Sequence, residues 1–97
     1  MKKFTTPEQT AKLIELGFEK PCSIASVEPI YGMGGISVAK AYTIGELMEM
    51  LDGVSELEIT RYGSGWEVVD ELRAFTGEEL IDSLFDMIVK LKDEGVI

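Results

Sequence analysis

Carboxylates are the residues of this sequence that lie close enough together to suggest chemistry. Pairs of neighbouring or helically spaced acids occur at Glu56/Glu58, Asp70/Glu71, Glu78/Glu79 and Asp82/Asp86. A carboxylate gains acid–base character when burial or a close partner shifts its pKa. Most of these acids fall on faces that the hydrophobic pattern predicts to be solvated. Asp70 is the exception, because it shares the strand parity of Trp66 and Val68. We expect it to be solvated or paired with Arg61 or Arg73.

Other residue types that commonly carry catalysis are scarce. The sequence contains no histidine and one cysteine, Cys22. Histidine is the usual base near neutral pH and the commonest zinc ligand. Without a histidine partner, Cys22 is expected to be a packed thiol rather than a nucleophile. The acids also lack the alternating spacing of a calcium loop. We therefore predict no catalytic and no metal-ligating residue.

Two further features suggest binding. Residues 32–35 are rich in glycine, but a phosphate-binding loop opens a helix, whereas a strand-like segment follows here and the loop has no lysine. A hairpin turn is the expected structure. Met33, Met48, Met50 and Met87 would suit an adaptable binding surface, although Met48 and Met87 have the spacing of core residues on helices. No cofactor site is predicted.

Composition narrows the class of protein. The 97 residues suit one domain, residues 1–97, with one modest core. The formal charge of −9, from 18 acidic and 9 basic residues, disfavours direct binding to nucleic acid or to anionic membranes. No apolar run approaches the roughly 18 residues of a membrane span, and the N-terminal residues do not resemble a signal peptide. A single cysteine suits a reducing compartment. A cytoplasmic protein is expected.

The elements that position these residues are organised around residues 76–97. Thr76 and Glu79 have the spacing of a capping box, and Gly95 is suited to close the helix. Seven apolar residues fall on one arc about 160° wide, which are Leu80, Ile81, Leu84, Phe85, Met87, Ile88 and Leu91. Replacement of Phe85 by alanine is expected to destabilise the fold strongly. So wide an arc favours a two-fold homodimer over coverage by the first helix alone.

Six other elements precede this helix, and the first four lie between residues 6 and 53. A first helix covers about residues 6–16, with Thr5 or Thr6 as its N-cap, and Gly17 ends it. Strands are expected at residues 22–28 and 36–41, with residues 29–35 as the turn. A second helix starts at Thr43, where Glu46 completes a capping box, and it ends at residues 52–53.

A hairpin of residues 54–62 and 66–72 follows the second helix. The hydrophobic pattern favours a two-residue turn, at residues 63–64 or 64–65, with Arg61 over Trp66 as a cation–π pair. The pattern therefore predicts an α+β fold of order α-ββ-α-ββ-α, in which three helices cover one face of an antiparallel sheet built from two β-hairpins.

A weak internal repeat accompanies this order. Residues 41–47 and 74–80 share four identical positions at a spacing of 33. Convergence on the same capping pattern explains the similarity, and a duplicated hairpin–helix unit is the alternative.

Several stretches resemble small uncharacterised proteins of gut bacteria and their phages or prophages. The residues that carry the resemblance are 17–22, 42–51, 66–68 and 79–97. The C-terminal run is the most specific part and residues 24–40 match least. The resemblance implies a mobile-element setting and no particular activity.

Together these features predict a non-enzymatic cytoplasmic module for protein–protein interaction or assembly, of phage or mobile-element type. Its partner is expected to be a protein, which includes a second copy of the chain, and not a nucleic acid or a membrane. The alternative is an acidic inhibitor that mimics nucleic-acid charge and blocks a basic protein. An enzyme that uses paired carboxylates is the third class, disfavoured by the missing histidine.

Overall fold

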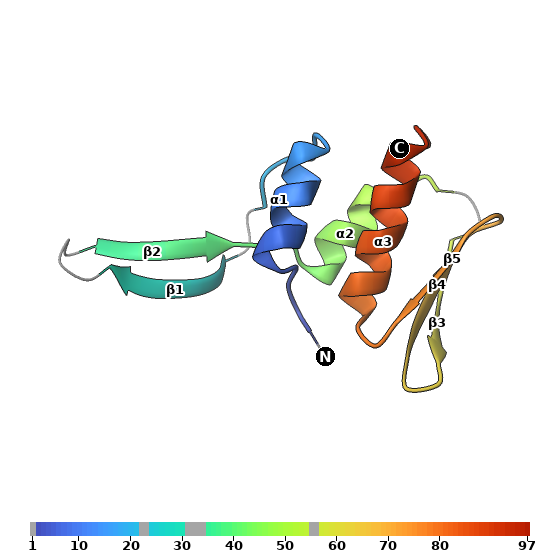
Figure 1. Ribbon diagram of the computed structural model, residues 1–97, viewed down its shortest axis with the longest axis horizontal. Helices are drawn as coiled ribbons and strands as arrows, with labels where there is room; N and C mark the ends of the chain where they lie inside the picture. Colours follow the sequence, from blue (N-terminus) through green and yellow to red (C-terminus); the bar gives the residue numbers. More distant parts are fainter. Residues whose placement is uncertain (1, 22–23, 31–34, 55–56) are drawn as a thin grey trace.

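The computed structural model describes residues 2–21, 24–30, 35–54 and 57–97. In this part of the chain, three helices and a three-stranded antiparallel sheet form an α+β body, and a separate hairpin extends from it (Figure 1). The elements, in order, are α1 (Pro7–Glu15), β1 (Ile24–Ile30), β2 (Gly35–Lys40), α2 (Ile44–Met50), β3 (Glu58–Tyr62), β4 (Gly65–Val69), β5 (Ala74–Gly77) and α3 (Leu80–Asp93).

The strands form two sheets, so the predicted single sheet of two hairpins and the order α-ββ-α-ββ-α are both wrong. β1 pairs with β2, whereas β3, β4 and β5 make the second sheet with β4 in the centre. The hydrophobic pattern missed β5 because only four residues form it, and strand and helix signals overlap there. β1 and β2 extend to Ile30 and Gly35, so Pro29 belongs to a strand and not to the predicted turn.

Thr76 is not the N-cap of α3. It lies in β5 opposite Glu67, and the helix begins four residues later with Glu79 at the N-cap, without a side-chain capping bond. Pairing with β4 satisfies the backbone of residues 74–77, so these residues do not start a helix. The Glu79 carboxylate instead accepts a bond of 2.6 Å from the Lys2 backbone N–H. Residues 41–47 and 74–80 thus form different structures, which favours convergence over duplication.

The first two helices begin where the sequence predicts. Thr6, not Thr5, caps α1 in a capping box with Gln9, and Pro7 occupies the first turn. Thr43 and Glu46 form the same motif at α2. Thr5 instead joins the two helices, because its N–H donates to the Tyr42 carbonyl at 3.0 Å.

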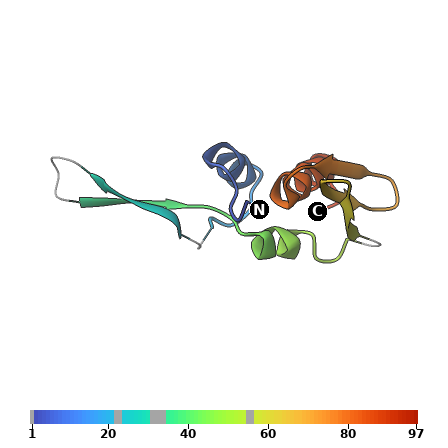
Figure 2. The ribbon, with the colours of Figure 1, turned by 90° about the horizontal axis from the view of Figure 1, so that it is seen from below.

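The core lies around α3. This helix packs against β4, β5 and α2, and Figure 2 shows it between α1 and the three-stranded sheet. The buried apolar cluster draws on all three helices and β4, and consists of Leu13, Tyr42, Leu47, Leu51, Val68, Leu80, Ile81, Leu84, Met87, Ile88 and Leu91. Elements of the same chain therefore cover the wide arc of α3, and its width does not argue for a second copy. Phe85 is only half-buried at the edge of this cluster.

The β3–β4 hairpin has the predicted two-residue turn. Arg61 lies opposite Trp66 and Tyr62 opposite Gly65, which leaves residues 63–64 as the turn. The Arg61 guanidinium lies 4.8 Å from the centre of the Trp66 ring, as a cation–π pair. A glycine is required at position 65, because a Cβ there would lie 2.3 Å from the carbonyl oxygen of Gly77 on β5.

The β1–β2 hairpin stands away from the body. It accounts for much of the longest dimension of the molecule, 52 Å against 31 and 17 Å for the other two (Figure 1). Its ladder places Val27 opposite Val38 and Pro29 opposite Ile36.

Candidate functional site

A groove opens where three separate segments of the chain meet. Its volume is about 520 Å³. The segments are the end of α2 with the residues after it, the turn between β4 and β5, and the C-terminal residues. The lining residues are Met50, Asp52, Gly53, Val54, Asp70, Glu71, Leu72, Arg73, Val96 and Ile97.

The turn between β4 and β5 is held by the side chain of Asp70. Its Oδ1 atom accepts hydrogen bonds from the N–H groups of Leu72 at 2.9 Å and Arg73 at 2.7 Å. The Asp70 N–H donates to the carbonyl of Arg73 at 2.9 Å. This is the chain reversal for which aspartate is favoured, and it ends β4 at Val69 rather than at the predicted Leu72. It also leaves Leu72 at the groove with 82% of its surface exposed.

Arg73 is fixed between two carboxylates. Its Nη1 lies 2.8 Å from Asp70 Oδ2, and its Nε lies 2.5 Å from Glu94 Oε2. The predicted pairing of Asp70 with an arginine is thus confirmed, with Arg73 rather than Arg61 as its partner. Burial alone would raise the pKa of Asp70, but the bonds from Leu72 and Arg73 together outweigh it, and the pKa is lowered. Asp70 is therefore ionised at neutral pH, and its carboxylate oxygens are engaged in holding the turn and Arg73.

The end of α3 brings the third segment to the groove. Gly95 has φ of 77° and the Val96 N–H donates to the Leu91 carbonyl at 2.9 Å, which closes the helix in a Schellman motif. The predicted role of Gly95 is confirmed. The motif turns the chain toward the groove, where Val96 remains 52% exposed and Ile97 is half-buried.

The groove combines an apolar surface with acidic charge. Met50, Val54 and Ile97 are half-buried, while Asp52 and Glu71 are exposed. Arg73 is the basic residue among the described residues that line the groove, and Asp70 and Glu94 balance its charge. The groove thus presents apolar side chains with a net negative rim. Such a surface is suited to binding a segment that is both basic and apolar.

The other acid pairs do not assemble into a site. Glu58, Glu71, Glu78 and Asp86 are exposed, and Glu56 lies outside the described residues. Asp82 accepts from the Lys2 Nζ at 2.6 Å and from the Gln9 Nε2 at 2.8 Å, so it ties the N-terminal segment to α3. Within the described ranges, no group of three or more His, Cys, Asp or Glu residues is placed to hold a metal ion.

The cysteine, the glycine-rich residues and the methionines have different outcomes in the structure. Cys22 and residues 31–34, with Met33, lie outside the part of the chain that the structure describes. Met87 is buried, as its spacing predicts, but Met48 is 47% exposed, because the short helix α2 buries the side that carries Leu47. Met50 is the methionine that reaches the groove.

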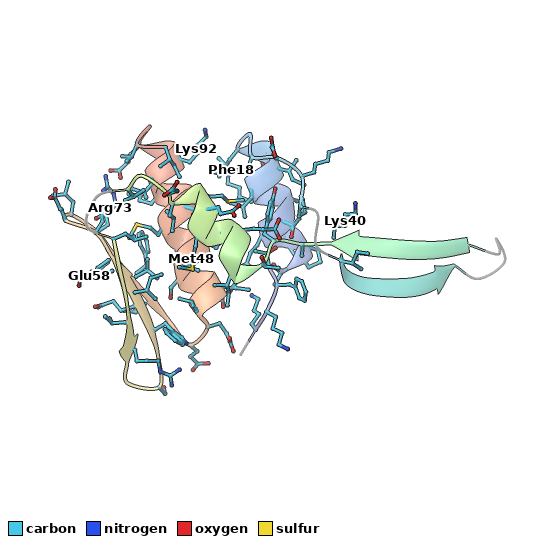
Figure 3. All side chains as sticks on the ribbon, turned by 180° about the vertical axis from the view of Figure 1, so that it is seen from behind. Phe18, Lys40, Met48, Glu58, Arg73 and Lys92 are labelled. Carbon is cyan, nitrogen blue, oxygen red and sulfur yellow. The ribbon has the colours of Figure 1, made fainter. Side chains whose placement is uncertain are left out.

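A second, smaller hollow of about 350 Å³ lies beside Tyr42. The Tyr42 hydroxyl donates to the Glu19 carbonyl, and burial followed by the charge of Glu46 raises its pKa. Nearby, the Lys92 ammonium lies 5.5 Å from the centre of the Phe18 ring (Figure 3). The hydroxyl is therefore engaged in holding the segment after α1 and is not directed at a ligand.

Sequence patterns gave no sign of the groove. Leu72 fell at the end of a predicted strand, and the three segments that meet there are separated by about twenty residues each along the chain. The one local signal was Asp70 three residues before Arg73, a spacing that suits an aspartate turn.

The fold and the groove define a small α+β protein with an open groove and an acidic rim. Comparison with protein-family models, with curated proteins and with solved structures gives no match to this chain. Among the described residues, none of the helices has the length and apolar character needed to cross a membrane.

Proposed function

We propose that this chain is a non-enzymatic protein-interaction module whose groove binds a basic, partly apolar segment of another protein. The observation that carries the proposal is Leu72, a large apolar side chain 82% exposed at a groove with an acidic rim. An isolated exposed leucine is common on protein surfaces. Here Val96, Met50, Val54 and Ile97 lie around the same groove, so Leu72 belongs to a group of apolar side chains and does not stand alone.

The charge of the groove selects the partner. Asp52 and Glu71 are exposed at the rim, and the charge of Arg73 is already balanced. An apolar side chain of such a partner would pack against the apolar residues of the groove, and flanking lysine or arginine residues would meet the acidic rim. The chain as a whole carries −9, which accelerates the approach of a basic segment. A phage or mobile-element setting forms part of the proposal and rests on the resemblance of residues 79–97 and the other stretches.

Selection from a library of random peptides displayed on phage tests this function. We expect the peptides retained by the wild-type protein to combine basic with apolar residues. Leu72→Ser should weaken their binding by about tenfold or more, because burial of one leucine contributes roughly 1.5–3 kcal/mol. Since Leu72 is exposed, this change should leave the melting temperature unaltered.

Met48→Ser is the matched control. Met48 is also exposed, at 47%, but does not line the groove. It should leave the affinity of the selected peptides unchanged. Peptides that bind wild type and Leu72→Ser equally well would place the binding surface elsewhere and contradict the proposal.

An acidic inhibitor that mimics nucleic-acid charge is the second candidate. It is favoured by the exposed acids on several elements, while Lys2 and Arg73 are engaged in ion pairs. Such an inhibitor would bind a basic protein through its overall charge. Its binding would fall steeply with salt and would not change in Leu72→Ser, which separates it from recognition in the groove.

A further inference from the structure

The β1–β2 hairpin has two long edges that pair with no other strand among the described residues. β1 and β2 form a sheet of their own, and the β3–β5 sheet lies on the far side of the body (Figure 1). A two-stranded hairpin alone is marginally stable in water. Unpaired edges of this kind are where another strand adds.

The two edges are not equivalent. Proline lacks an N–H, and a ladder accommodates it where its nitrogen faces away from the paired strand. Pro29 therefore removes a donor from the outer edge of β1. Ile36 of β2 lies opposite Pro29, and Val38, two residues further along β2, lies opposite Val27. By the alternation of an antiparallel pair, Ile36 and Val38 direct their backbone groups outward from β2. β2 contains no proline, so its outer edge is the one with a full set of donors and acceptors.

Charge identifies the occupant of this edge. Residues 21–39 contain one charged residue, Glu28, in a chain whose formal charge is −9. Two copies of so acidic a chain repel each other over most of their surfaces. The hairpin is the stretch where they approach with least repulsion, and it projects away from the body of the chain (Figure 1). A second copy also presents the same edge, so the backbone donors and acceptors of β2 in one chain can bond with those of β2 in the other.

We propose that β2 pairs antiparallel with β2 of a second copy, forming a four-stranded sheet across a two-fold axis. Pairing of a strand with its own copy is isologous and closes at two chains. Pro29 stops further addition at the outer β1 edges, so the assembly does not grow into a fibre. This inference does not depend on the peptide groove, which lies at the other end of the molecule.

Matched proline substitutions at opposite edges of one rung test the proposal. Val38→Pro removes a donor from the outer edge of β2, and Val27→Pro removes the corresponding donor from the outer edge of β1. By sedimentation equilibrium at micromolar concentration we expect the wild type and Val27→Pro to be dimers. Val38→Pro should associate at least about tenfold more weakly, since each copy loses an inter-chain hydrogen bond. Helical circular dichroism should be unchanged, because the hairpin lies outside the core.

Cysteine cross-linking provides the second measurement. In a Cys22→Ser background, single cysteines at Ile36, Ser37 and Val38 should give a disulfide-linked dimer at the position nearest the two-fold axis, and a cysteine at Glu58 should not. A wild-type protein that is monomeric at every concentration would overturn the proposal. Equal loss of association in both proline variants would also overturn it, as would larger assemblies or the absence of any cross-link along β2.

Discussion

At the groove, two residues of one turn have opposite surroundings. The carboxylate of Asp70 is almost fully enclosed, with 6% of its side chain exposed, and accepts bonds from Leu72 and Arg73. Leu72 is itself 82% exposed. The polar residue is thus turned inward and the apolar one outward, which reverses the usual preference. The turn stabilised by Asp70 is what keeps Leu72 available to a partner.

Asp70→Asn should lower the free energy of unfolding at pH 7 by roughly 1 kcal/mol, since it weakens the hydrogen bonds that hold a turn at the protein surface. The folded-state pKa of Asp70 is lowered, so its stabilisation is present above the ordinary value of 3.8 and is lost as pH falls through the folded value. The difference between wild type and variant should therefore be constant near neutrality and shrink below about pH 4. Urea denaturation from pH 2.5 to 7 measures it.

Glu71→Gln is the control for this experiment, because it makes the same chemical change at an exposed neighbour. Its stability should follow that of the wild type across the acid range. A difference between Asp70→Asn and wild type that stays constant down to pH 2.5 would show that the carboxylate of Asp70 does not titrate with a lowered pKa.

Tyr42→Phe tests the other end of the pH range. The raised pKa of Tyr42 means that its hydroxyl stabilises the fold fully below the ordinary value of 10.0, and that this stabilisation declines as pH rises above it. The variant should lose about 1 kcal/mol at pH 7 with the bond to the Glu19 carbonyl. Above pH 10 the gap should close. A difference in melting temperature between wild type and Tyr42→Phe that stays the same from pH 8 to pH 11.5 would argue against a raised pKa of Tyr42.

At the scale of elements, α3 carries the stability of the body. Leu84 is fully buried, whereas Phe85 lies half-buried at the edge of the core. Leu84→Ala should therefore lower the free energy of unfolding by about 2–5 kcal/mol. Phe85→Ala should lower it by less, about 1–2 kcal/mol, because less of its surface leaves water on folding. This corrects the strong effect that the apolar arc predicts for Phe85. Equal losses in the two variants would show that both side chains are core.

Local capping signals predicted two helix starts and failed at the third. Thr43 caps α2, since its isolated bridge to Phe4 does not extend into a ladder that would draw the following residues away from the helix. Thr76 has the same signal, but β4 offers its residues a ladder, and pairing over Ala74–Gly77 removes them from the helix. The capping motif is a local preference, and tertiary pairing outweighs it. The apolar arc of α3 was predictable because burial follows the periodicity of the whole helix. Its cap was not predictable, because a capping signal rests on a few residues that another strand can pair with.

At the scale of the molecule, the net charge disfavours nucleic acid as a partner. We expect no measurable affinity for duplex DNA at physiological salt, because the net charge is −9 and Lys2 and Arg73 are engaged in ion pairs. Fluorescence anisotropy with a labelled duplex tests this. Binding that strengthens as the salt concentration is lowered would contradict the expectation.

The candidate site depends on the whole molecule, and for that reason the sequence did not predict it. Met50, Leu72 and Val96 belong to three segments that only the packing of α3 brings together. Their spacing along the chain follows no periodicity that helix or strand geometry would produce. The ion pairs of Arg73 were partly predictable, because Asp70 is near it in sequence, but its bond to Glu94 joins two elements.

The groove as a binding surface is tested most directly by nuclear magnetic resonance of the 15N-labelled protein, titrated with a synthetic peptide of alternating lysine and leucine. In physiological salt, we predict that the amide shifts of Gly53, Leu72 and Val96 change together and saturate, while those of β2 and the first turn of α1 do not. Shifts spread evenly over the acidic faces of α1 and α3, with none concentrated at Leu72, would contradict recognition by the groove and leave charge alone as the basis of binding.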